Sequence, residues 1–386
     1  MKVGIVGGAL QGMEAVYLSK KAGYETLVMD RKEKAPARSL SDEFFLGDII
    51  KDPDSVKKIL SDCDVIIPAF EESDALCKLN EVVMSMEIPF LFDFSSYNIS
   101  CSKERSNQII ASLGISLPEP WPQCGYPIIV KPSSQSGSIG VSEVNNDAER
   151  VKALKIVTDL HDTPILQEFV SGKSVSIEVI GNGKKSRSYT TTEVILDSNY
   201  DCKRVECQPN ILSEEEDEEF ADIGMKIANS IGLKALMDVE AIRTKKGLRV
   251  LEIDARIPSQ TPAAIQAATG VNLMQELVCS ALGKETGVKS SNECSAYEHY
   301  VIQGPTMRTC GEKQFGHVEN PYFANGLFGE DQIITDYQPG KSEWRATVIN
   351  HGKTPAQVLE KRKKFISNVM SQCDIEEYID RSPEMV

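Results

Sequence analysis

Residues 238–256 alternate acidic and hydrophobic positions in two successive runs. A period of two is typical of a β-strand with one face in a core, so the pattern predicts a hairpin over this stretch. Asp238 and Glu240 share one face of the first strand, and Glu252 and Asp254 share one face of the second. The hairpin therefore brings up to four carboxylates onto one patch.

Carboxylates that crowd one patch repel each other unless a cation lies among them. Oxygen ligands suit Mg²⁺, which usually takes one or two protein carboxylates and completes its shell with the phosphates of a substrate. Arg256 follows on the same face, where its guanidinium could bind a phosphoryl oxygen or a carboxylate. A solvated acidic strand face is the alternative, and it is disfavoured because Leu251 and Ile253 need a core behind them.

The first hundred residues predict a doubly wound α/β domain. A hydrophobic run at 3–6 is followed by Gly7, Gly8 and Gly12 and by a helical pattern to about residue 22. Further strands are expected at 26–29, 44–46, 65–68 and 90–92. The glycine spacing does not match G-x-G-x-x-G, which argues against a nicotinamide oxidoreductase.

Glu71 lies in the loop after the strand 65–68, at the edge of the sheet where ligands of such domains bind. Its carboxylate could meet an amino group of a ligand. Equally, an acid at this place could simply stabilise the N-terminus of the next helix.

A run of small residues at 133–140 directly follows the short strand 128–132, which carries Lys131. Such a run can expose successive backbone N–H groups and so hold phosphates. It lacks the Gly-Lys-Ser/Thr ending of a P-loop. A plain Ser/Gly linker is the alternative, disfavoured because a strand resumes directly after Gly140.

The rest of the chain mixes helical and strand patterns. Helices are expected at about 102–113, 148–159, 213–230, 263–269, 270–282 and 355–370, and strands at 165–170, 174–180, 187–196, 297–303 and 344–349. Three domains are predicted: 1–100, 101–283 with a lid over about 126–175, and a C-terminal α+β domain over 284–386.

Composition narrows the function classes. The net charge is 42 − 57 = −15 over 386 residues, which argues against nonspecific nucleic-acid binding. No hydrophobic run approaches the length of a membrane span, and no signal-peptide pattern is present. Ten cysteines without a CxxC pair are typical of reduced thiols in a cytoplasmic protein.

Two motifs carry a family resemblance. Val130-Lys131-Pro132 before a glycine-containing loop, and Leu251-Glu-Ile-Asp-Ala-Arg256 in place of Glu-x-Asn-x-Arg, resemble the ATP-grasp carboxylate–amine ligases. The separation 252 − 240 = 12 also matches several members and favours Glu240 over Asp238 as a metal ligand. The resemblance implies an N-terminal Rossmann-like (pre-ATP-grasp) domain followed by two α+β subdomains that clasp ATP.

The resemblance also implies roles for individual residues. The ATP phosphates would be bound by two lysines and a small-residue loop: Lys103, Lys131, Ser133, Ser134, Ser136, Gly137 and Ser138. The adenine would lie against Gln167, Glu168, Phe169 and Val170. Two Mg²⁺ ions would be held by Glu240, Glu252 and Asp254. Arg256 would be catalytic, stabilising an acyl phosphate as it forms and breaks. Asp254 replaces the usual Asn, and Lys173 stands where an acid usually meets the ribose, which leaves the ribose partner open.

A narrower resemblance is carried by residues 7–12, 17–23 and 251–262, which are similar to the ATP-grasp ligases of pyrrolysine biosynthesis. It implies that the carboxylate of 3-methyl-D-ornithine is joined to the ε-amine of L-lysine. The implied substrate residues are Gln11, Glu71, Asp238, Arg256, Ser259, Gln260 and Thr261. The alternatives are an ATP-grasp ligase for another carboxylate and amine, a carboxylase component, and a regulatory nucleotide-binding protein without turnover. The sequence does not fix the oligomeric state, and a homodimer is one state that it allows.

Overall fold

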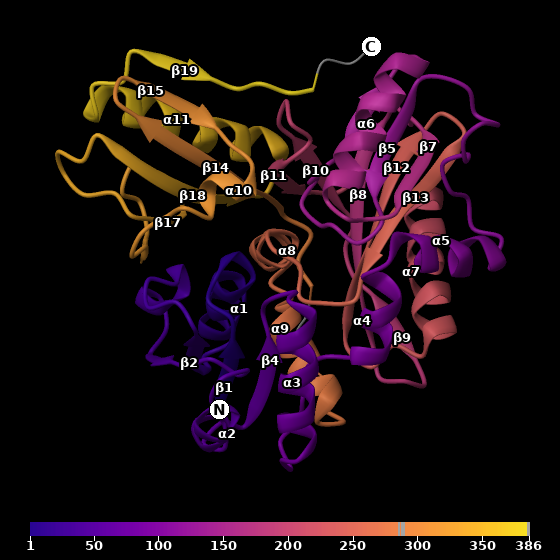
Figure 1. The fold of residues 1–386 in the computed structure, drawn as a ribbon. Helices are drawn as coiled ribbons and strands as arrows, with labels where there is room; N and C mark the ends of the chain where they lie inside the picture. Colours follow the sequence, from indigo (N-terminus) through magenta and orange to yellow (C-terminus); the bar gives the residue numbers. More distant parts are fainter. Residues whose placement is uncertain (285, 287–289, 384–386) are drawn as a thin grey trace.

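The computed structural model describes residues 1–284, 286 and 290–383. Its N-terminal part is a parallel four-stranded sheet in the order β3-β2-β1-β4, as the hydrophobic runs predicted (Figure 1). The strands are β1 (Lys2–Val6), β2 (Glu25–Asp30), β3 (Glu43–Leu46) and β4 (Val65–Pro68), and the helices are α1 (Leu10–Lys21), η1 (Pro36–Ser39), α2 (Pro53–Leu60) and α3 (Ser73–Met84). The hydrophobic runs form strands because α1 on one face and α2 and α3 on the other bury them.

The prediction of a strand at 90–92 is wrong. Phe90 makes only an isolated parallel bridge to Ile66. The chain cannot continue the sheet because Asp93 caps the helix α4 (Phe94–Ser100), accepting hydrogen bonds from the backbone N–H groups of Ser95 and Ser96. The next helix is α5 (Lys103–Ser112), with the expected cap at Ser102.

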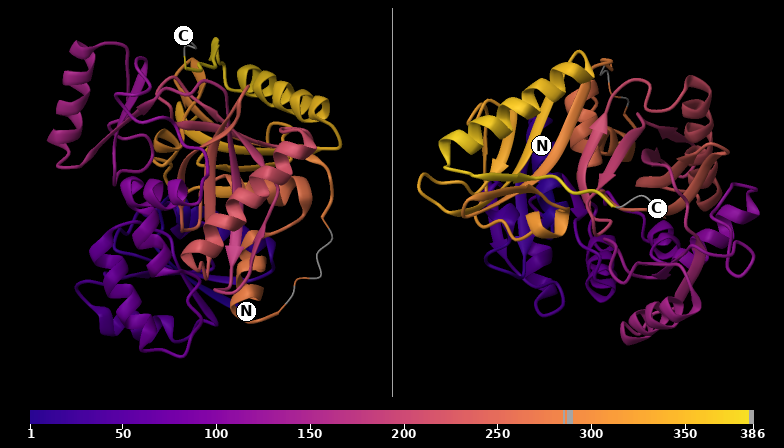
Figure 2. Two further views of the ribbon diagram at one scale, coloured as in Figure 1. Left: turned by 90° about the vertical axis from the view of Figure 1, so that its right-hand side faces the viewer. Right: turned by 90° about the horizontal axis from the view of Figure 1, so that it is seen from above.

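A small separate sheet follows, in the order β6-β5-β7. It consists of β5 (Ile128–Pro132), β6 (Ser142–Val144) and β7 (Pro164–Glu168), covered by α6 (Asp147–Asp159). Figure 2 shows α6 on the outer side of this unit, away from the rest of the molecule. The Ser/Gly run lies between β5 and β6.

The remaining strands form one sheet of twelve, with the main order β13-β12-β8-β10-β11-β14-β18-β17-β16. Its strands are β8 (Lys173–Gly181), β9 (Ser186–Ser188), β10 (Thr192–Leu196), β11 (Cys202–Cys207), β12 (Leu236–Thr244), β13 (Gly247–Asp254), β14 (Cys294–Gln303), β15 (Thr306–Thr309), β16 (Tyr322–Ala324), β17 (Gln332–Thr335), β18 (Glu343–Gly352) and β19 (Glu377–Ile379). Antiparallel pairing of β11 with β14 carries the sheet across the boundary predicted near residue 283.

Four longer helices pack on this sheet, and one short helix follows β15. They are α7 (Glu214–Ile231), α8 (Thr261–Thr269), α9 (Leu273–Ala281), α11 (Pro355–Gln372) and the short α10 (Glu312–Phe315). The acid run at 214–217 is the first turn of α7, whose N-cap Ser213 forms a capping box with Glu216. Figure 1 shows α8 at the centre of the molecule, between the N-terminal domain and both halves of the large sheet. Across the described ranges, no helix combines the length and hydrophobicity that a membrane crossing requires.

Candidate functional site

A cavity of about 850 Å³ is lined by the small sheet, the 238–256 hairpin and the C-terminal part of the chain. Among its lining residues are Lys103, Lys131, Asp238, Glu240, Glu252, Asp254, Arg256, Ser259, Gln260 and Thr261. The cavity thus gathers residues from three separate parts of the sequence that had been singled out as candidates.

The acids of the hairpin lie in two rows across neighbouring strands. Asp238 pairs in register with Asp254 on one side and Glu178 on the other, and Glu240 pairs with Glu252. Directly paired residues share a face of the sheet, so the carboxylates converge as the alternation predicted. Glu178 was not singled out from the sequence, although its place in the alternating strand 174–180 would have put it on this face.

Lysine and arginine side chains lie beside these rows of acids. Lys103 Nζ lies 2.9 Å from Glu252 Oε2, and Lys131 Nζ donates to the carbonyl oxygen of Leu251 at 3.3 Å. Arg256 Nε lies 2.7 Å from Glu71 Oε1, and Arg256 Nη2 lies 3.2 Å from Asp254 Oδ2. Further along the cavity, Lys173 Nζ lies 2.8 Å from Glu193 Oε2.

Burial and neighbouring charges shift the pKa values of the hairpin carboxylates in different directions. Burial and the charges of Glu252 and Asp254 raise the pKa of Glu240 to about 8. Burial also raises the pKa of Asp254 to about 6, with Glu252 adding to the shift and Arg256 opposing it. Burial alone would raise the pKa of Glu252, but the charges of Lys103 and Lys131 outweigh it and lower that pKa.

Burial first, and neighbouring carboxylates second, thus raise the pKa of Glu240 and of Asp254, and a divalent ion placed among these acids would favour their charged forms. Within the described residues, no three His, Cys, Asp or Glu side chains already converge as a complete metal cage. One or two carboxylates with phosphate oxygens are, however, the shell that Mg²⁺ prefers. Glu240, Glu252 and Asp254 therefore offer carboxylates of the kind that such an ion takes from a protein.

The Ser/Gly run forms an irregular loop beside the cavity. Gly137, Ser138 and Gly140 have positive φ angles of 58°, 57° and 73°, as expected for a run of small residues. Lys103 Nζ donates to the carbonyl oxygen of Gln135 at 2.8 Å, and Ser138 Oγ donates to the carbonyl oxygen of Tyr200 at 2.6 Å. The loop is thus held close to both the cation row and the large sheet.

Not every serine of this loop faces the cavity. Gly137 and Ser138 line it, whereas Ser133, Ser134 and Ser136 are not among its lining residues. Ser133 Oγ accepts from the backbone N–H of Glu104, and Ser134 donates to Asp162 Oδ2 from both its backbone N and its Oγ. These two serines shape the loop, and direct phosphate contacts from them remain a prediction.

Gln167, Glu168, Phe169 and Val170 line the far end of the cavity. The Phe169 N–H already donates to the carbonyl oxygen of Pro127 at 3.2 Å, so it is engaged within the protein. Glu193 on β10 also lines this end, and the sequence analysis did not single it out. Its signal was a lone acid in an otherwise uncharged run at 192–196.

The predicted substrate residues fall into two groups. Ser259, Gln260 and Thr261 line the cavity at the start of α8. Gln11 and Glu71 do not line it; Gln11 Nε2 donates to Glu71 Oε1 at 2.7 Å, and Glu71 in turn pairs with Arg256. They lie behind Arg256 and hold its guanidinium.

Glu312, at the first position of α10, lines the cavity beside Ser259 and was missed by the sequence analysis. It lies between the strands expected at 297–303 and 344–349, where no helix or strand was predicted. Nothing in the local pattern of one acid after Gly311 indicates that the fold brings it to the cavity.

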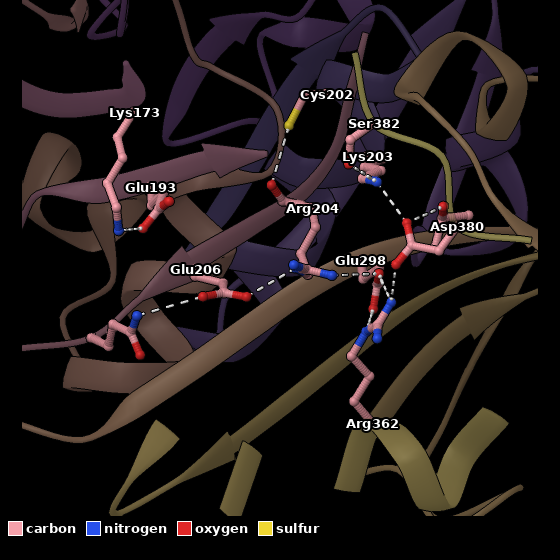
Figure 3. A network of polar contacts seen from close by, with 12 residues as sticks. Lys173, Glu193, Cys202, Lys203, Arg204, Glu206, Glu298, Arg362, Asp380 and Ser382 are labelled. Atoms are coloured by element: carbon pink, nitrogen blue, oxygen red, sulfur yellow. Dashed lines mark hydrogen bonds and ion pairs between the residues drawn. The ribbon is translucent and has the colours of Figure 1, made fainter. Parts of the chain in front are cut away.

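The C-terminal segment closes another part of the wall. Ser382 and Pro383 line the cavity, and Lys203 of β11 holds this segment through Asp380 Oδ1 at 2.6 Å and Ser382 Oγ at 3.0 Å (Figure 3). Figure 3 also shows the adjoining network in which Arg204 and Arg362 both reach Glu298.

Comparison with known families matches both parts of the fold. Residues 101–260 match the ATP-grasp domain family, and residues 1–86 match the ribonucleotide synthetase preATP-grasp domain family. The biotin carboxylase domain of Hydrogenobacter thermophilus 2-oxoglutarate carboxylase, solved with MgADP, ADP and bicarbonate, has the same fold. Its TM-score is 0.73 at 15% identity, covering 95% of this chain and 89% of that one.

Three curated relatives at 34–36% identity carry the same name. The 3-methyl-D-ornithine–L-lysine ligase of Methanosarcina acetivorans is 34% identical over 370 residues, covering 93% of this chain and 97% of the relative. The ligase of the same name from Methanosarcina mazei is 36% identical over 300 residues, covering 77% of each chain. With the fold, the acidic hairpin and these relatives together, the chain belongs to the ATP-grasp carboxylate–amine ligases, in the family of the 3-methyl-D-ornithine–L-lysine ligases.

Proposed function

We propose that this protein uses ATP to join the carboxylate of 3-methyl-D-ornithine to the ε-amine of L-lysine. The observation that carries the proposal is a single cavity in which Lys103, Lys131 and the acidic hairpin meet Arg256 and the turn at 259–261. Such a cavity can hold ATP at one end and amino acids at the other. The two amino acids are those named for the relatives that share about a third of this sequence.

ATP would lie with its adenine against Gln167–Val170 and its phosphates between Lys103, Lys131 and the loop at 133–140. Glu193 is the candidate ribose partner, because it lines the adenine end and pairs with Lys173, which replaces the acid usual in the family. Glu240, Glu252 and Asp254 would hold Mg²⁺, for which two ions are expected. When bound there, Mg²⁺ would supply positive charge that offsets the charge developing on the phosphates during transfer.

The reaction consists of two displacements. A carboxylate oxygen of 3-methyl-D-ornithine attacks the γ-phosphorus, ADP leaves, and an acyl phosphate forms. The lysine ε-amine then attacks the acyl carbon, loses a proton, and phosphate leaves as the amide bond forms.

The side chains of the cavity would position the groups that react. Lys103 and Lys131 act as point charges on the phosphates, while Arg256 orients the acyl phosphate between the two steps. Glu71 and Gln11 keep the Arg256 guanidinium in place. Closure of the loop at 133–140 keeps water from the acyl phosphate.

The domain division at residues 100 and 283, with a lid over about 126–175, belongs to the same proposal. The separate three-stranded sheet supports the lid, because it carries the phosphate loop and shares no strand with the large sheet.

The test is ADP release with D-ornithine alone, L-lysine alone and both together, with the product read by mass spectrometry. D-Ornithine serves as an accessible analogue of its methylated form. ADP that requires both amino acids, together with the mass of their amide, is the expected result. ADP formed only with some other carboxylate and amine would retain the ATP-grasp mechanism and reject these substrates.

A further inference from the structure

Glu312 is a carboxylate of the cavity to which the proposed function gives no role. In the part of the chain that the structure describes, Lys103 pairs with Glu252, and Arg256 pairs with Glu71 and Asp254, but no cation pairs with Glu312. An acid that lines a cavity without a cation partner is a candidate for binding a cationic ligand group.

One oxygen of Glu312 is fixed by the protein and the other is not. Oε2 accepts from Ser259 Oγ at 2.6 Å and lies 3.4 Å from Gln260 Nε2. Oε1 receives no hydrogen bond within the described residues. It lies 3.9 Å, and Lys313 Nζ lies 4.0 Å, from where a Cβ on Gly137 would stand, and in the described part of the chain Lys313 forms no ion pair with Glu312. The free oxygen therefore lies next to the loop at 133–140, near the place where an acyl phosphate would form.

The backbone that supplies these two donors is strained. Gln260 has φ 80° and ψ −56°, and the N–H of Thr261 donates to the carbonyl oxygen of Ser259 at 3.1 Å. This is a γ-turn of a rare and costly kind for a residue with a side chain. Strain of this type persists where the surroundings impose it, and it concentrates at ligand sites.

One further acceptor of the cavity is buried without a partner. Asp238 Oδ1 belongs to a residue that is only 5% exposed, and this atom has no hydrogen bond among the described residues. Such an atom costs free energy unless a ligand or water satisfies it. Asp238 lines the same cavity as Ser259, Gln260 and Glu312, which favours a polar ligand there.

We propose that Glu312 Oε1 binds the side-chain ammonium group of one of the two amino-acid substrates. The inference rests on the proposed function, since both of its substrates are diamino acids. An ammonium group has three donors and a full positive charge, which matches the free oxygen of Glu312 in a cavity that also holds the unpartnered Asp238 Oδ1. Ser259 and Gln260 would act as positioning residues that turn the free oxygen toward the ligand.

The test compares Glu312→Gln with the wild type in steady-state kinetics. The KM of one of the two amino acids should rise by about tenfold or more, while the KM of ATP changes less than about twofold. Glu319→Gln is the matched control, since it removes the same charge from an exposed position in the same part of the chain. It should change none of the three KM values.

Analogues that lack the side-chain ammonium give an independent readout. D-Norvaline replaces D-ornithine as the carboxylate substrate, and L-norleucine competes with L-lysine as an inhibitor. In the wild type one of these analogues should bind markedly worse than its diamino counterpart, and Glu312→Gln should remove most of that difference. Glu312→Asp should retain part of the difference, which provides a second variant if the Gln protein folds poorly.

Unchanged preference for both diamino acids in Glu312→Gln and Glu312→Asp would overturn the proposal, whatever happens to kcat. Failure of the proposed function would give a different result: the wild-type protein itself would make no amide from the two amino acids. In that case Glu312 would be tested on the amines and carboxylates that do support ADP release.

Discussion

Lys203 Nζ lies 2.6 Å from Asp380 Oδ1, although these residues are far apart in the sequence (Figure 3). The Lys203 side chain is almost completely buried, and its other partners are the carbonyl oxygen of Arg381 at 2.7 Å and Ser382 Oγ. The ammonium of a central strand is thus satisfied by the C-terminal segment, whose next residues line the cavity.

Asp380→Ala should therefore destabilise the protein by about 2–3 kcal/mol, because a buried ammonium loses its counter-charge. Lys203→Met should cost less, since a methionine of similar length fills the space and leaves no buried charge. Urea unfolding of both single variants and of the double variant measures the interaction free energy between Lys203 and Asp380. Glu72→Ala is the control: it breaks the exposed pair with Arg31 and should cost no more than about 0.5 kcal/mol.

Glu252→Ala should reduce ADP formation by about 100-fold or more, because the variant removes a charge expected to hold Mg²⁺ against the phosphates. The variant relieves repulsion on Glu240 but also leaves Lys103 without its ion-pair partner, so urea unfolding of the variant accompanies the assay. ADP release with both amino acids, at several Mg²⁺ concentrations, is the measurement. Glu214→Ala, in the exposed first turn of α7, is the control. Full turnover by Glu252→Ala would reject the metal assignment.

Glu193→Gln should weaken ATP binding by about tenfold through loss of a charged acceptor for the ribose hydroxyls. The discriminating substrate is 2′-deoxy-ATP or 3′-deoxy-ATP. The wild type should prefer ATP over at least one of them, and Glu193→Gln should lose that preference. If the variant retains the wild-type preference for both hydroxyls, the ribose is bound elsewhere.

Glu14 predicts a pH dependence of stability. It lies on α1, is 2% exposed, and accepts a hydrogen bond from the N–H of Ala263 at 2.8 Å. Burial raises its pKa from 4.5 to about 8. Above pH 4.5 the unfolded chain releases this proton while the folded chain retains it, so the free energy of unfolding should fall as pH rises toward 8.

Glu14→Gln cannot ionise and should lack this component. The difference in the free energy of unfolding between variant and wild type should therefore grow in favour of the variant from pH 5 to pH 8, by about 3–5 kcal/mol in total. Urea unfolding at several pH values measures it. A difference that stays constant with pH would mean that Glu14 titrates normally.

Local patterns predicted much of the fold because each carried its own physical signal. The alternation at 238–256 gave the hairpin and the convergence of its acids, since side chains two residues apart on a strand must share a face. Ser213 and Glu216 marked the start of α7 through a capping box. The glycine-rich start and the Val-Lys-Pro strand were equally local.

What the sequence did not reveal depends on long-range packing. Glu312 and Glu193 reach the cavity only because β11 pairs with β14 and β10 pairs with β8, which no local pattern encodes. Phe90 looked like a strand residue because its neighbours are hydrophobic, yet the cap at Asp93 ends the extended segment. The orientation of Ser133 and Ser134 depends on partners in α5 and at Asp162.

Because β11 pairs with β14, the strands bearing the acids and those of the C-terminal part form one continuous sheet. The three-stranded sheet is separate from it, and the contacts of Lys103 with Gln135 and of Ser138 with Tyr200 hold its loop beside the cavity. In the proposed mechanism, spent nucleotide leaves under this loop, and these few hydrogen bonds break once in every catalytic cycle. Their strength links the speed of turnover to how well the reactive acyl phosphate is protected from water.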